Sequence, residues 1–168
     1  GLHGVGMSVV NALSKEMSAE VRRGGKIYRQ TYAYGKITSE VTVIGECPIE
    51  ETGTIIHFKP DETIFKEGTV YDFKIIAQRL SELSFLNKGI KLILIDKRGE
   101  GKTETFYHPN GISEFIPFLN RNKKPLHKDV IIFEKEKDDV IVDVAMQFTD
   151  SYTENIYSYT NNIHTHEG

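Results

Sequence analysis

The sequence lacks several features that would assign it to a common class of protein. Cys47 is its only cysteine, so no internal disulfide can form, which favours a cytoplasmic protein. The longest apolar run, IKLILI, is far too short to cross a bilayer, and no secretory hydrophobic segment occurs. The net charge of -3 excludes a global attraction to nucleic acid or acidic membranes. We therefore expect a cytoplasmic globular protein without membrane association.

The motifs of several enzyme classes are also missing. No Gly-Lys-Ser/Thr follows the N-terminal glycines, which excludes a Walker A loop, and no serine or cysteine lies in a nucleophile elbow. His164 and His166, next to Glu167, form an H-x-H pattern without a third ligand at a convincing spacing, so we predict no metal site. No carboxylate stands out as a general base. The residues alone therefore predict no catalytic residue in this chain.

The chain does have a glycine-rich start, GLHGVGMSVVNALS. Gly1, Gly4 and Gly6 allow positive φ angles and close approach of backbone amides, and apolar residues then recur at helical spacing from Val5 to Met17. A loop of this kind before a helix can hold an anion, because the free amides and the helix dipole both point towards it. A plain turn with a helix cap explains the same residues equally well. The pattern leaves both interpretations open.

The rest of the sequence predicts an α+β fold. Gly24-Gly25 is a hairpin turn between two strands, and Pro117 kinks or ends a short helix. Helices are expected at 72–89 and 111–123, and strands within 19–37, 37–46, 53–61, 90–98, 103–108 and 130–163.

Three groups of polar residues are open to a functional and to an ordinary interpretation. Arg22 and Arg23 are either solvated charges at a strand edge or contacts at a pocket rim. Thr54 opens a strand and could offer its hydroxyl to a purine, although threonine is common there. The segment NRNKKPLHK could contact a phosphate backbone or could be ordinary wet surface, and its cations are Arg121, Lys123, Lys124 and Lys128.

Four segments taken together resemble the B subunits of bacterial type IIA topoisomerases: GLHGVGMSVVNALS, TGTIIHFKPDETIF, RLSELSFLNKGI and ENIYSYTNNIHTHEG. The similarity runs from Gly1 to Gly168, in the family's order and at its spacing. It implies that residues 1–108 are the C-terminal half of a GHKL (Bergerat) ATPase α/β sandwich. Residues 109–168 would then begin a transducer domain, ribosomal-protein-S5-domain-2-like, with the boundary near His108–Asn110.

The resemblance also assigns candidate site residues. Thr54 matches a threonine that helps to hold the adenine, and Ile56 and Met7 match apolar positions near the base pocket. Arg23 matches a rim arginine that contacts aminocoumarin inhibitors, which suits guanidinium chemistry. The end of the ATP lid, which closes on the β- and γ-phosphates, would be Gly1, Leu2, His3, Gly4, Val5, Gly6 and Met7.

For the complete protein the resemblance implies an ATP-hydrolysing isomerase that drives DNA strand passage and supercoiling. Its cofactors would be ATP and Mg²⁺, and its partners double-stranded DNA, the A subunit in a heterotetramer, and a second B subunit through ATP-dependent dimerisation. The family's general base and Mg²⁺ ligand would lie upstream of Gly1. We therefore expect a fragment that has no ATPase activity alone and that exposes an apolar face to self-association or a complementing chain. Between the gyrase and topoisomerase IV branches we favour gyrase for its prevalence, and a non-catalytic interaction domain with the same fold stays an alternative.

Overall fold

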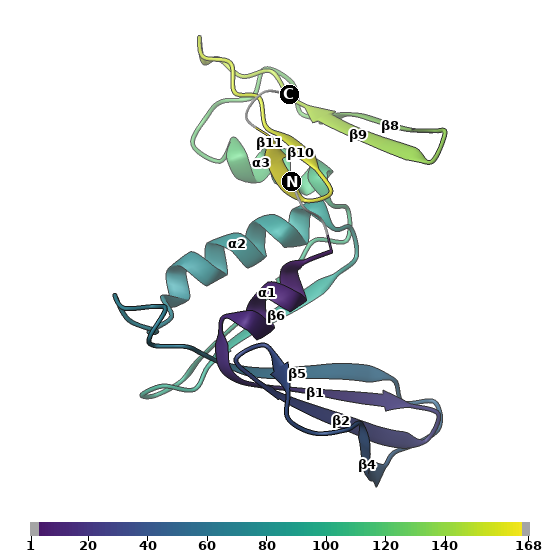
Figure 1. Ribbon diagram of the computed structural model, residues 1–168. Coiled ribbons are helices and arrows are strands. Elements are labelled where there is room, and N and C mark those ends of the chain that lie inside the picture. The colour runs from purple at the N-terminus through teal and green to yellow at the C-terminus, as the bar shows by residue number, and fades with distance from the viewer. Residues whose placement is uncertain (1–3, 166–168) are drawn as a thin grey trace. The chain divides into compact units, whose positions relative to one another are not determined.

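The computed structural model describes residues 4–165 and divides the chain into two compact units. Unit 1 is Gly1–Val70 and unit 2 is Tyr71–Gly168. Both combine helices with antiparallel strands, so the predicted α+β class is confirmed (Figure 1). The predicted division near His108–Asn110 concerns domains rather than compact units and stays a prediction. Of the residues that the structure describes, none belongs to a helix long and apolar enough to cross a membrane.

Unit 1 is built on a five-stranded antiparallel sheet with the strand order β3-β2-β1-β5, and β4 also pairs with β2 (Figure 1). Its elements are α1 (Gly6–Ala12), β1 (Ser14–Arg23), β2 (Lys26–Ala33), β3 (Lys36–Ile37), β4 (Thr42–Glu46) and β5 (Gly53–Pro60). The β1–β2 turn has φ angles of 59° at Gly24 and 79° at Gly25. Such angles suit glycine and match the right-handed twist of the two strands, so the predicted hairpin is confirmed.

The first helix is shorter than the sequence pattern indicates. Apolar residues recur at helical spacing as far as Met17, but α1 ends at Ala12 and Met17 lies in β1. The pairing of β1 with both β2 and β5 explains the difference, because a central strand satisfies its backbone groups on two sides. Ser14, the first residue of β1, donates its hydroxyl to the Val10 carbonyl over 2.6 Å, which closes the end of the helix.

The two faces of the unit 1 sheet differ in chemistry. Residues directly opposite each other on antiparallel strands share a face, and successive residues alternate between faces. One face carries cross-strand ion pairs, among them Glu16–Lys59 at 2.5 Å and Glu20–Arg29 at 3.7 Å. The other face carries Met17 opposite Phe58, and the Met17 side chain is only 7% exposed. Unit 1 therefore has a charged face and an apolar face.

Unit 2 contains two helices and three separate antiparallel hairpins, β6–β7, β8–β9 and β10–β11. Its elements are α2 (Phe73–Leu86), β6 (Lys91–Asp96), β7 (Lys102–Tyr107), α3 (Ile112–Leu119), β8 (Ile131–Lys137), β9 (Val140–Met146), β10 (Ser158–Thr160) and β11 (Ile163–Thr165). Helix α3 continues through Pro117 and ends two residues later at Leu119. Pro117 lies in the sixth position of this short helix, so it ends the helix nearby rather than preventing it.

Helix α2 begins and ends as its sequence predicts. The Asp72 carboxylate accepts the backbone N–H groups of Lys74 and Ile75, at 2.7 and 3.1 Å, and so caps the N-terminus. Gly89 follows the helix with φ at 82°. The expected apolar stripe is only partly buried, because Ile75 is 70% exposed while Phe85, outside the stripe, is 2% exposed.

Phe85 is the centre of the unit 2 core. Its ring stacks on His108 with 3.5 Å between ring centroids and on Phe115 at 4.9 Å. Phe118 lies 5.2 Å away in a tilted arrangement. These contacts join α2 to α3 and to the residue that follows β7. Phe85 and Phe115 are buried, whereas Phe118 is exposed, so the apolar stabilisation from this cluster comes mainly from the first two rings.

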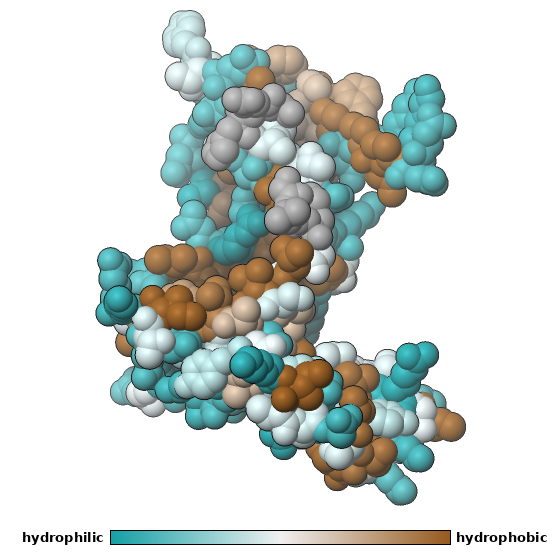
Figure 2. Space-filling model, in the orientation of Figure 1, coloured by the Kyte–Doolittle hydropathy of each residue, from teal (hydrophilic) through white to brown (hydrophobic). Residues whose placement is uncertain are grey.

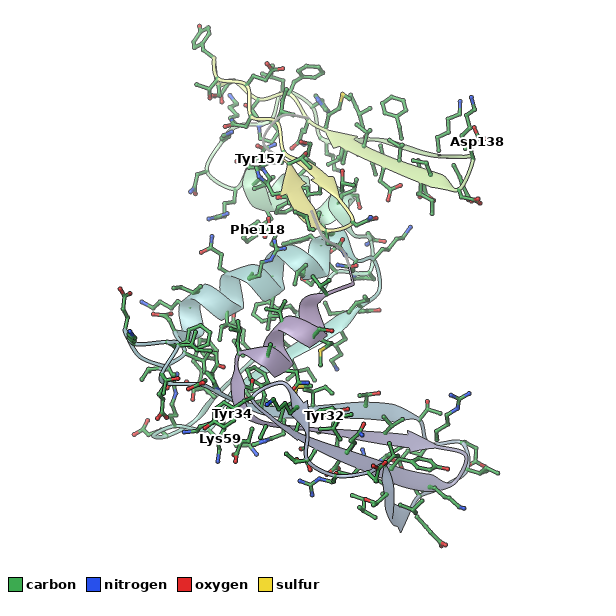
Figure 3. The ribbon with its side chains drawn as sticks, in the orientation of Figure 1. Tyr32, Tyr34, Lys59, Phe118, Asp138 and Tyr157 are labelled. Atoms are coloured by element: carbon green, nitrogen blue, oxygen red, sulfur yellow. The ribbon has the colours of Figure 1, made fainter. Side chains whose placement is uncertain are left out.

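The β8–β9 hairpin is a two-stranded ribbon with apolar residues on one face (Figure 2). Its tip is a turn at Asp138 and Asp139, with φ angles of 51° and 62° (Figure 3). The predicted alternation is confirmed for Val140 to Met146, whereas Phe148 lies beyond the end of β9. The apolar side chains stay between 37% and 60% exposed: Ile131, Phe133, Val140, Val142, Val144 and Met146. These side chains leave an apolar surface of the ribbon exposed. The exposed apolar face expected for the half ATPase sheet concerns residues 1–108 and stays a prediction.

Candidate functional site

Part of the predicted ATP lid lies at the start of α1. Gly1, Leu2 and His3 lie outside the described residues. Gly4 has φ at 81°, a left-handed conformation that favours glycine, and no atom lies within 4 Å of the place a Cβ would take. Gly4 is therefore required for the path of the backbone and not for close packing.

Within residues 4–165, the first backbone N–H groups of α1 have no hydrogen-bond acceptor. Val5 is the N-cap residue, and its side chain cannot accept a hydrogen bond; the first intrahelical bond runs from Val9 N–H to the Val5 carbonyl, at 2.9 Å. The first amides of the helix, from Gly6 onwards, thus have no partner within the helix. Met7 is half exposed. Free amides at a helix start suit an anion such as a phosphate oxygen.

Helix α1 is held to the sheet at its other end. A Cβ on Gly35 would lie 3.2 Å from the Ala12 Cα, so the β2–β3 turn approaches the helix closely. Tyr34 N–H donates to the Ser14 carbonyl over 3.0 Å, and Asp61 N–H donates to the Leu13 carbonyl over 2.9 Å. The loop at Gly4 is therefore connected through a short, fixed helix to the sheet that carries the other candidate residues.

The sheet brings three predicted residues onto one face. Thr54 lies opposite Val21 and Ile56 lies opposite Ala19, so all four point to the apolar face. Arg23, two residues after Val21 on β1, points to the same face. Thr54 is exposed and Ile56 is half-buried, which leaves both open to a ligand. A side-chain hydroxyl, an aliphatic group and a guanidinium on one surface can bind a flat polar ring.

The two neighbouring arginines differ in their partners. Arg22 points to the charged face, where its Nε lies 3.0 Å from Oε1 of Glu51. Within residues 4–165, the Arg23 side chain makes no hydrogen bond or ion pair, and it is exposed. The Arg22 side chain is thus held by an ion pair on the charged face, and the Arg23 side chain is exposed on the face that carries Thr54 and Ile56. The residue pair alone did not distinguish these orientations; the strand register does.

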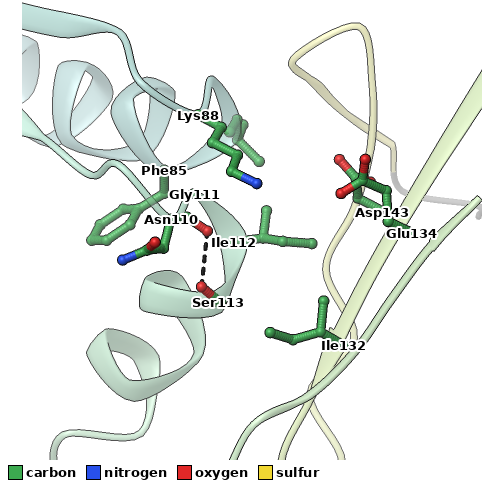
Figure 4. A pocket seen from close by; sticks show the side chains of 10 residues that line it. Phe85, Lys88, Asn110, Gly111, Ile112, Ser113, Ile132, Glu134 and Asp143 are labelled. Atoms are coloured by element: carbon green, nitrogen blue, oxygen red, sulfur yellow. Dashed lines mark hydrogen bonds between the residues drawn. The ribbon is translucent and has the colours of Figure 1, made fainter.

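Unit 2 contains two features that the sequence did not indicate. A pocket of about 230 Å³ has Lys88 on one wall and the carboxylates of Glu134 and Asp143 on the other (Figure 4). Ser113 donates its hydroxyl to the Asn110 carbonyl over 2.8 Å at its edge. A larger pocket of about 650 Å³ lies between α3, β9 and residues 155–162. Neither contains a set of groups with an evident catalytic role.

A hydrogen-bonded clasp joins α2 to the β10–β11 hairpin. The Tyr159 hydroxyl donates to Oε1 of Glu82 over 2.8 Å, and Arg79 pairs with the other oxygen of Glu82. Asn162 donates to Oδ1 of Asn87 over 2.9 Å. Burial opposes ionisation of Glu82, but the bonds from Tyr159 and Arg79 outweigh it and hold the pKa of Glu82 below its ordinary value. Burial, together with Glu82, raises the pKa of Tyr159.

No local pattern could have revealed the clasp, because its partners lie more than seventy residues apart in the sequence. For metals, the part of the chain that the structure describes holds no group of three or more histidine, cysteine or acidic residues placed to bind an ion. His166 and Glu167 of the H-x-H pattern lie outside it.

Comparison with known proteins gives consistent matches. The DNA gyrase B family matches residues 111–168. The DNA gyrase B protein of Halalkalibacterium halodurans is 48% identical over 168 residues, which are 100% of this chain and 26% of that protein. The corresponding protein of Archaeoglobus fulgidus is 52% identical over 172 residues, again covering 100% of this chain and 26% of the relative. The chain thus spans about a quarter of the length of each of these two relatives, and 41% of the matching gyrase B sequence of Bacillus mycoides.

Solved structures show the same fold. The 43K ATPase domain of Thermus thermophilus gyrase B, in complex with an aminocoumarin, has a TM-score of 0.87 and 36% identity, covering 96% of this chain and 44% of that one. The B-subunit of the DNA gyrase from Myxococcus xanthus has a TM-score of 0.84 at 23% identity, covering 95% and 46%. The second match supports the fold alone.

Proposed function

We propose that this chain, which belongs to the DNA gyrase B family, is part of the ATPase region of a bacterial type IIA DNA topoisomerase. In the complete protein, an isomerase, this region would couple ATP binding and hydrolysis to DNA strand passage and supercoiling. The supporting observation is the similarity over the whole chain to gyrase B proteins, including 36% identity to a solved gyrase B ATPase domain. The named relatives are gyrase B proteins, which favours gyrase over the topoisomerase IV alternative. No observation favours the non-catalytic interaction domain.

The proposed nucleotide contacts follow the geometry of unit 1. Residues Gly1–Met7 would form the end of the ATP lid, where the free amides at the start of α1 suit phosphate oxygens. Thr54 would offer its hydroxyl towards the adenine, and Ile56 would pack near the base. Arg23, on the same face, would contact aminocoumarin inhibitors, because its guanidinium has no other partner among residues 4–165.

The cofactors of the proposed reaction are ATP and Mg²⁺. The described residues fit the phosphate part of ATP at α1, but they contain no group of carboxylates and histidines suited to hold a metal. As the resemblance to the family implies, the proposal assigns the Mg²⁺ ligand and the general base to parts of the protein outside this chain. Bound Mg²⁺ would neutralise phosphate charge, while this chain's residues would close on the nucleotide and orient it.

The proposed partners are those of the complete protein. They are double-stranded DNA, the gyrase A subunit in a heterotetramer, and a second B subunit through ATP-dependent dimerisation. We propose a cytoplasmic location, in keeping with the single cysteine. Dimerisation by ATP would need nucleotide contacts that exist only in the closed state, since a ligand shifts an equilibrium only through its differential affinity.

A segment-exchange experiment tests the proposal. This chain would replace the matching segment of Halalkalibacterium halodurans gyrase B, which is 48% identical. The chimera would be reconstituted with the A subunit of the same organism and assayed for ATP-dependent supercoiling of relaxed plasmid. We expect supercoiling within about tenfold of the parent rate. A correctly folded chimera without ATP-dependent supercoiling would contradict the proposal.

The same chimera tests the assigned side chains through inhibition by an aminocoumarin. Arg23→Ala should raise the inhibitor concentration for half-inhibition by about tenfold or more, since loss of a hydrogen bond to a charged group is worth about 1.5–3 kcal/mol. Arg22→Ala is the matched control, because it removes a neighbouring arginine that is paired with Glu51 on the opposite face. Equal effects of the two variants would remove Arg23 from the proposed site.

A further inference from the structure

Residues 120–128, NRNKKPLHK, are named here the basic loop, and they form the connection from α3 to β8 together with Asp129 and Val130. The loop has four cationic side chains, Arg121, Lys123, Lys124 and Lys128, and no carboxylate. Arg121, Lys124 and Lys128 are exposed, so these charges face water. Within the described range 4–165, the three lysine ammonium groups form no ion pair or hydrogen bond. The sequence left open whether this segment is a phosphate contact or ordinary wet surface.

The backbone of the basic loop is fixed along the segment that follows β9. Leu126 N–H donates to the Phe148 carbonyl over 2.9 Å, and Asp150 N–H donates to the Lys124 carbonyl over 3.0 Å. An isolated β-bridge joins the loop to Thr149. The loop is therefore paired like a short additional strand. A flexible surface loop would show none of this pairing.

Two neutral side chains fix the loop further. His127 accepts the Phe148 N–H at Nε2 over 2.9 Å, and its Nδ1 lies 2.7 Å from the Asp129 carbonyl oxygen. Gln147 donates to the His127 carbonyl over 3.1 Å and accepts from the Asn120 amide over 3.1 Å. These contacts use backbone groups and neutral side chains. The cationic groups of the lysines are thereby left free while their backbone is held in place.

Arg121 is held in a defined orientation at the start of the loop. Its guanidinium lies over the Phe118 ring, 4.5 Å from the centroid, and Nη1 donates to the Phe118 carbonyl over 2.9 Å. A guanidinium has five N–H donors in a planar fork, so most of them stay available. A pre-oriented guanidinium loses less side-chain entropy when it binds a phosphate.

The chemistry of the loop fits a phosphate backbone better than a protein surface. Lysine is depleted at protein–protein interfaces, whereas lysine, arginine and asparagine are the usual donors to nucleic-acid phosphates. Asp150 accepts the Lys124 N–H at 3.3 Å and Asp129 directly follows Lys128, so two carboxylates offset part of the charge of the four cations. Duplex DNA presents a negative charge about every 1.7 Å along its axis, so several cations of one fixed loop can be matched at once.

We propose that the basic loop is a contact surface for the phosphate backbone of duplex DNA. The choice of duplex DNA rests on the proposed function, but the contact itself needs neither nucleotide nor the lid. The proposed contact is independent of the DNA sequence, because the basic loop would bind phosphates and not the edges of the bases. Its role is to position DNA against unit 2.

The test measures binding of the 168-residue chain to a fluorescent duplex of about 30 base pairs, by anisotropy, at about 50 to 200 mM salt. The loop variant combines Lys123→Gln, Lys124→Gln and Lys128→Gln. The matched control combines Lys36→Gln, Lys66→Gln and Lys74→Gln, three exposed lysines with the same change in net charge. The loop variant should bind about tenfold more weakly, and the slope of log K against log salt should fall by about 2 to 3. The control should keep the slope of the unaltered chain.

Two further arms make the result decisive. Gln147→Ala keeps all four charges of the basic loop but removes the hydrogen bonds from Gln147 to the His127 carbonyl and from Asn120 to Gln147. It should therefore weaken DNA binding a few-fold while the slope of log K against log salt stays unchanged. Anionic lipid vesicles of phosphatidylserine and phosphatidylcholine replace the duplex in a parallel titration. Equal loss in the loop and control variants, or a loop-dependent binding to vesicles but not to DNA, would overturn the proposal. Thermal unfolding of each variant separates loss of contact from loss of fold.

The outcome is distinguishable from failure of the proposed function. If the chimeric gyrase supercoils DNA but the loop variant binds duplex as well as the control does, the inference alone fails. If the chimera is inactive and the loop variant still loses salt-dependent DNA binding, the proposed function alone fails.

Discussion

Units 1 and 2 hold their structures by different means. In unit 1, one continuous sheet joins all five strands, and its side chains divide into a charged and an apolar face. In the described part of unit 2, the three hairpins do not join into one sheet. Side chains around Phe85 join α2 to α3 and to the residue after β7, and the Tyr159–Glu82 clasp joins α2 to β10. The elements of unit 1 are therefore held together mainly by backbone hydrogen bonds between strands, and those of unit 2 mainly by a few side-chain contacts. This difference predicts where single substitutions have large effects.

The largest effect is expected for Phe85→Ala. Phe85 is 2% exposed and stacks on His108 and Phe115, so its loss should lower the stability of unit 2 by about 3–5 kcal/mol. Hydrogen exchange followed by mass spectrometry would measure the loss separately for peptides of each unit. The amides of β1 and β5 in unit 1 should keep their protection.

Phe133→Ala is the control for this comparison, because it removes the same side chain from a position that is 58% exposed. Its effect should stay within about 0.5 kcal/mol, as for most exposed positions. Equal losses at the two positions would show that the Phe85 stack is not the core of unit 2. Loss of protection in β1 on replacing Phe85 would show that the two units do not unfold independently.

The same difference explains how far sequence reasoning succeeds. Local patterns predicted the Gly24-Gly25 turn, the helix within 72–89 and the strands within 90–98 and 103–108, because each depends on neighbouring residues. The end of α1 was misjudged, since pairing of β1 with two strands overrides a helical spacing that extends to Met17. The central role of Phe85 was missed because it depends on contacts with His108 and Phe115. These residues lie more than twenty positions away, so no helical or strand periodicity in the sequence links them to Phe85.

The candidate site shows the same limit. Chemistry selected Arg22 and Arg23 together, but the sequence cannot tell which of two adjacent strand residues points to the apolar face. A shift of register by one residue would exchange them. The register of β1 against β5, set by pairs such as Val21 opposite Thr54, places Arg23 and not Arg22 on the face that carries Thr54. The positions of Gly1, Leu2 and His3 lie outside the described residues and stay predictions.

An intermediate effect is expected from pH in unit 2. His108 and the backbone N–H of Asn110 hydrogen-bond to Glu114 and hold the pKa of its carboxyl below the ordinary value. An unfolded chain takes up this proton at higher pH than the folded one, so the carboxylate stabilises unit 2 above about pH 5. This stabilisation is lost as the pH falls through the folded pKa.

Glu114→Gln should therefore lower the free energy of unfolding of unit 2 at neutral pH by about 1 kcal/mol. It should also reduce the fall of that free energy at acid pH, here called the acid limb. Urea unfolding at a series of pH values would measure this. Glu154→Gln removes an exposed carboxylate of the same unit for which the structure shows no contact, and it should leave the acid limb unchanged. If both variants kept the steep acid limb, other carboxylates would be responsible for it.

The smallest effect is expected on the charged face of unit 1. Glu51→Gln breaks the pair with Arg22, whose side chains are 45% and 30% exposed, so water already screens their attraction. The stability of unit 1 should change by less than about 0.5 kcal/mol, and added salt should reduce the difference further. Urea unfolding at low and high salt would measure both. A loss above about 1 kcal/mol would mean that side chains, and not backbone pairing alone, hold unit 1 together, and the two units would then differ in degree rather than in kind.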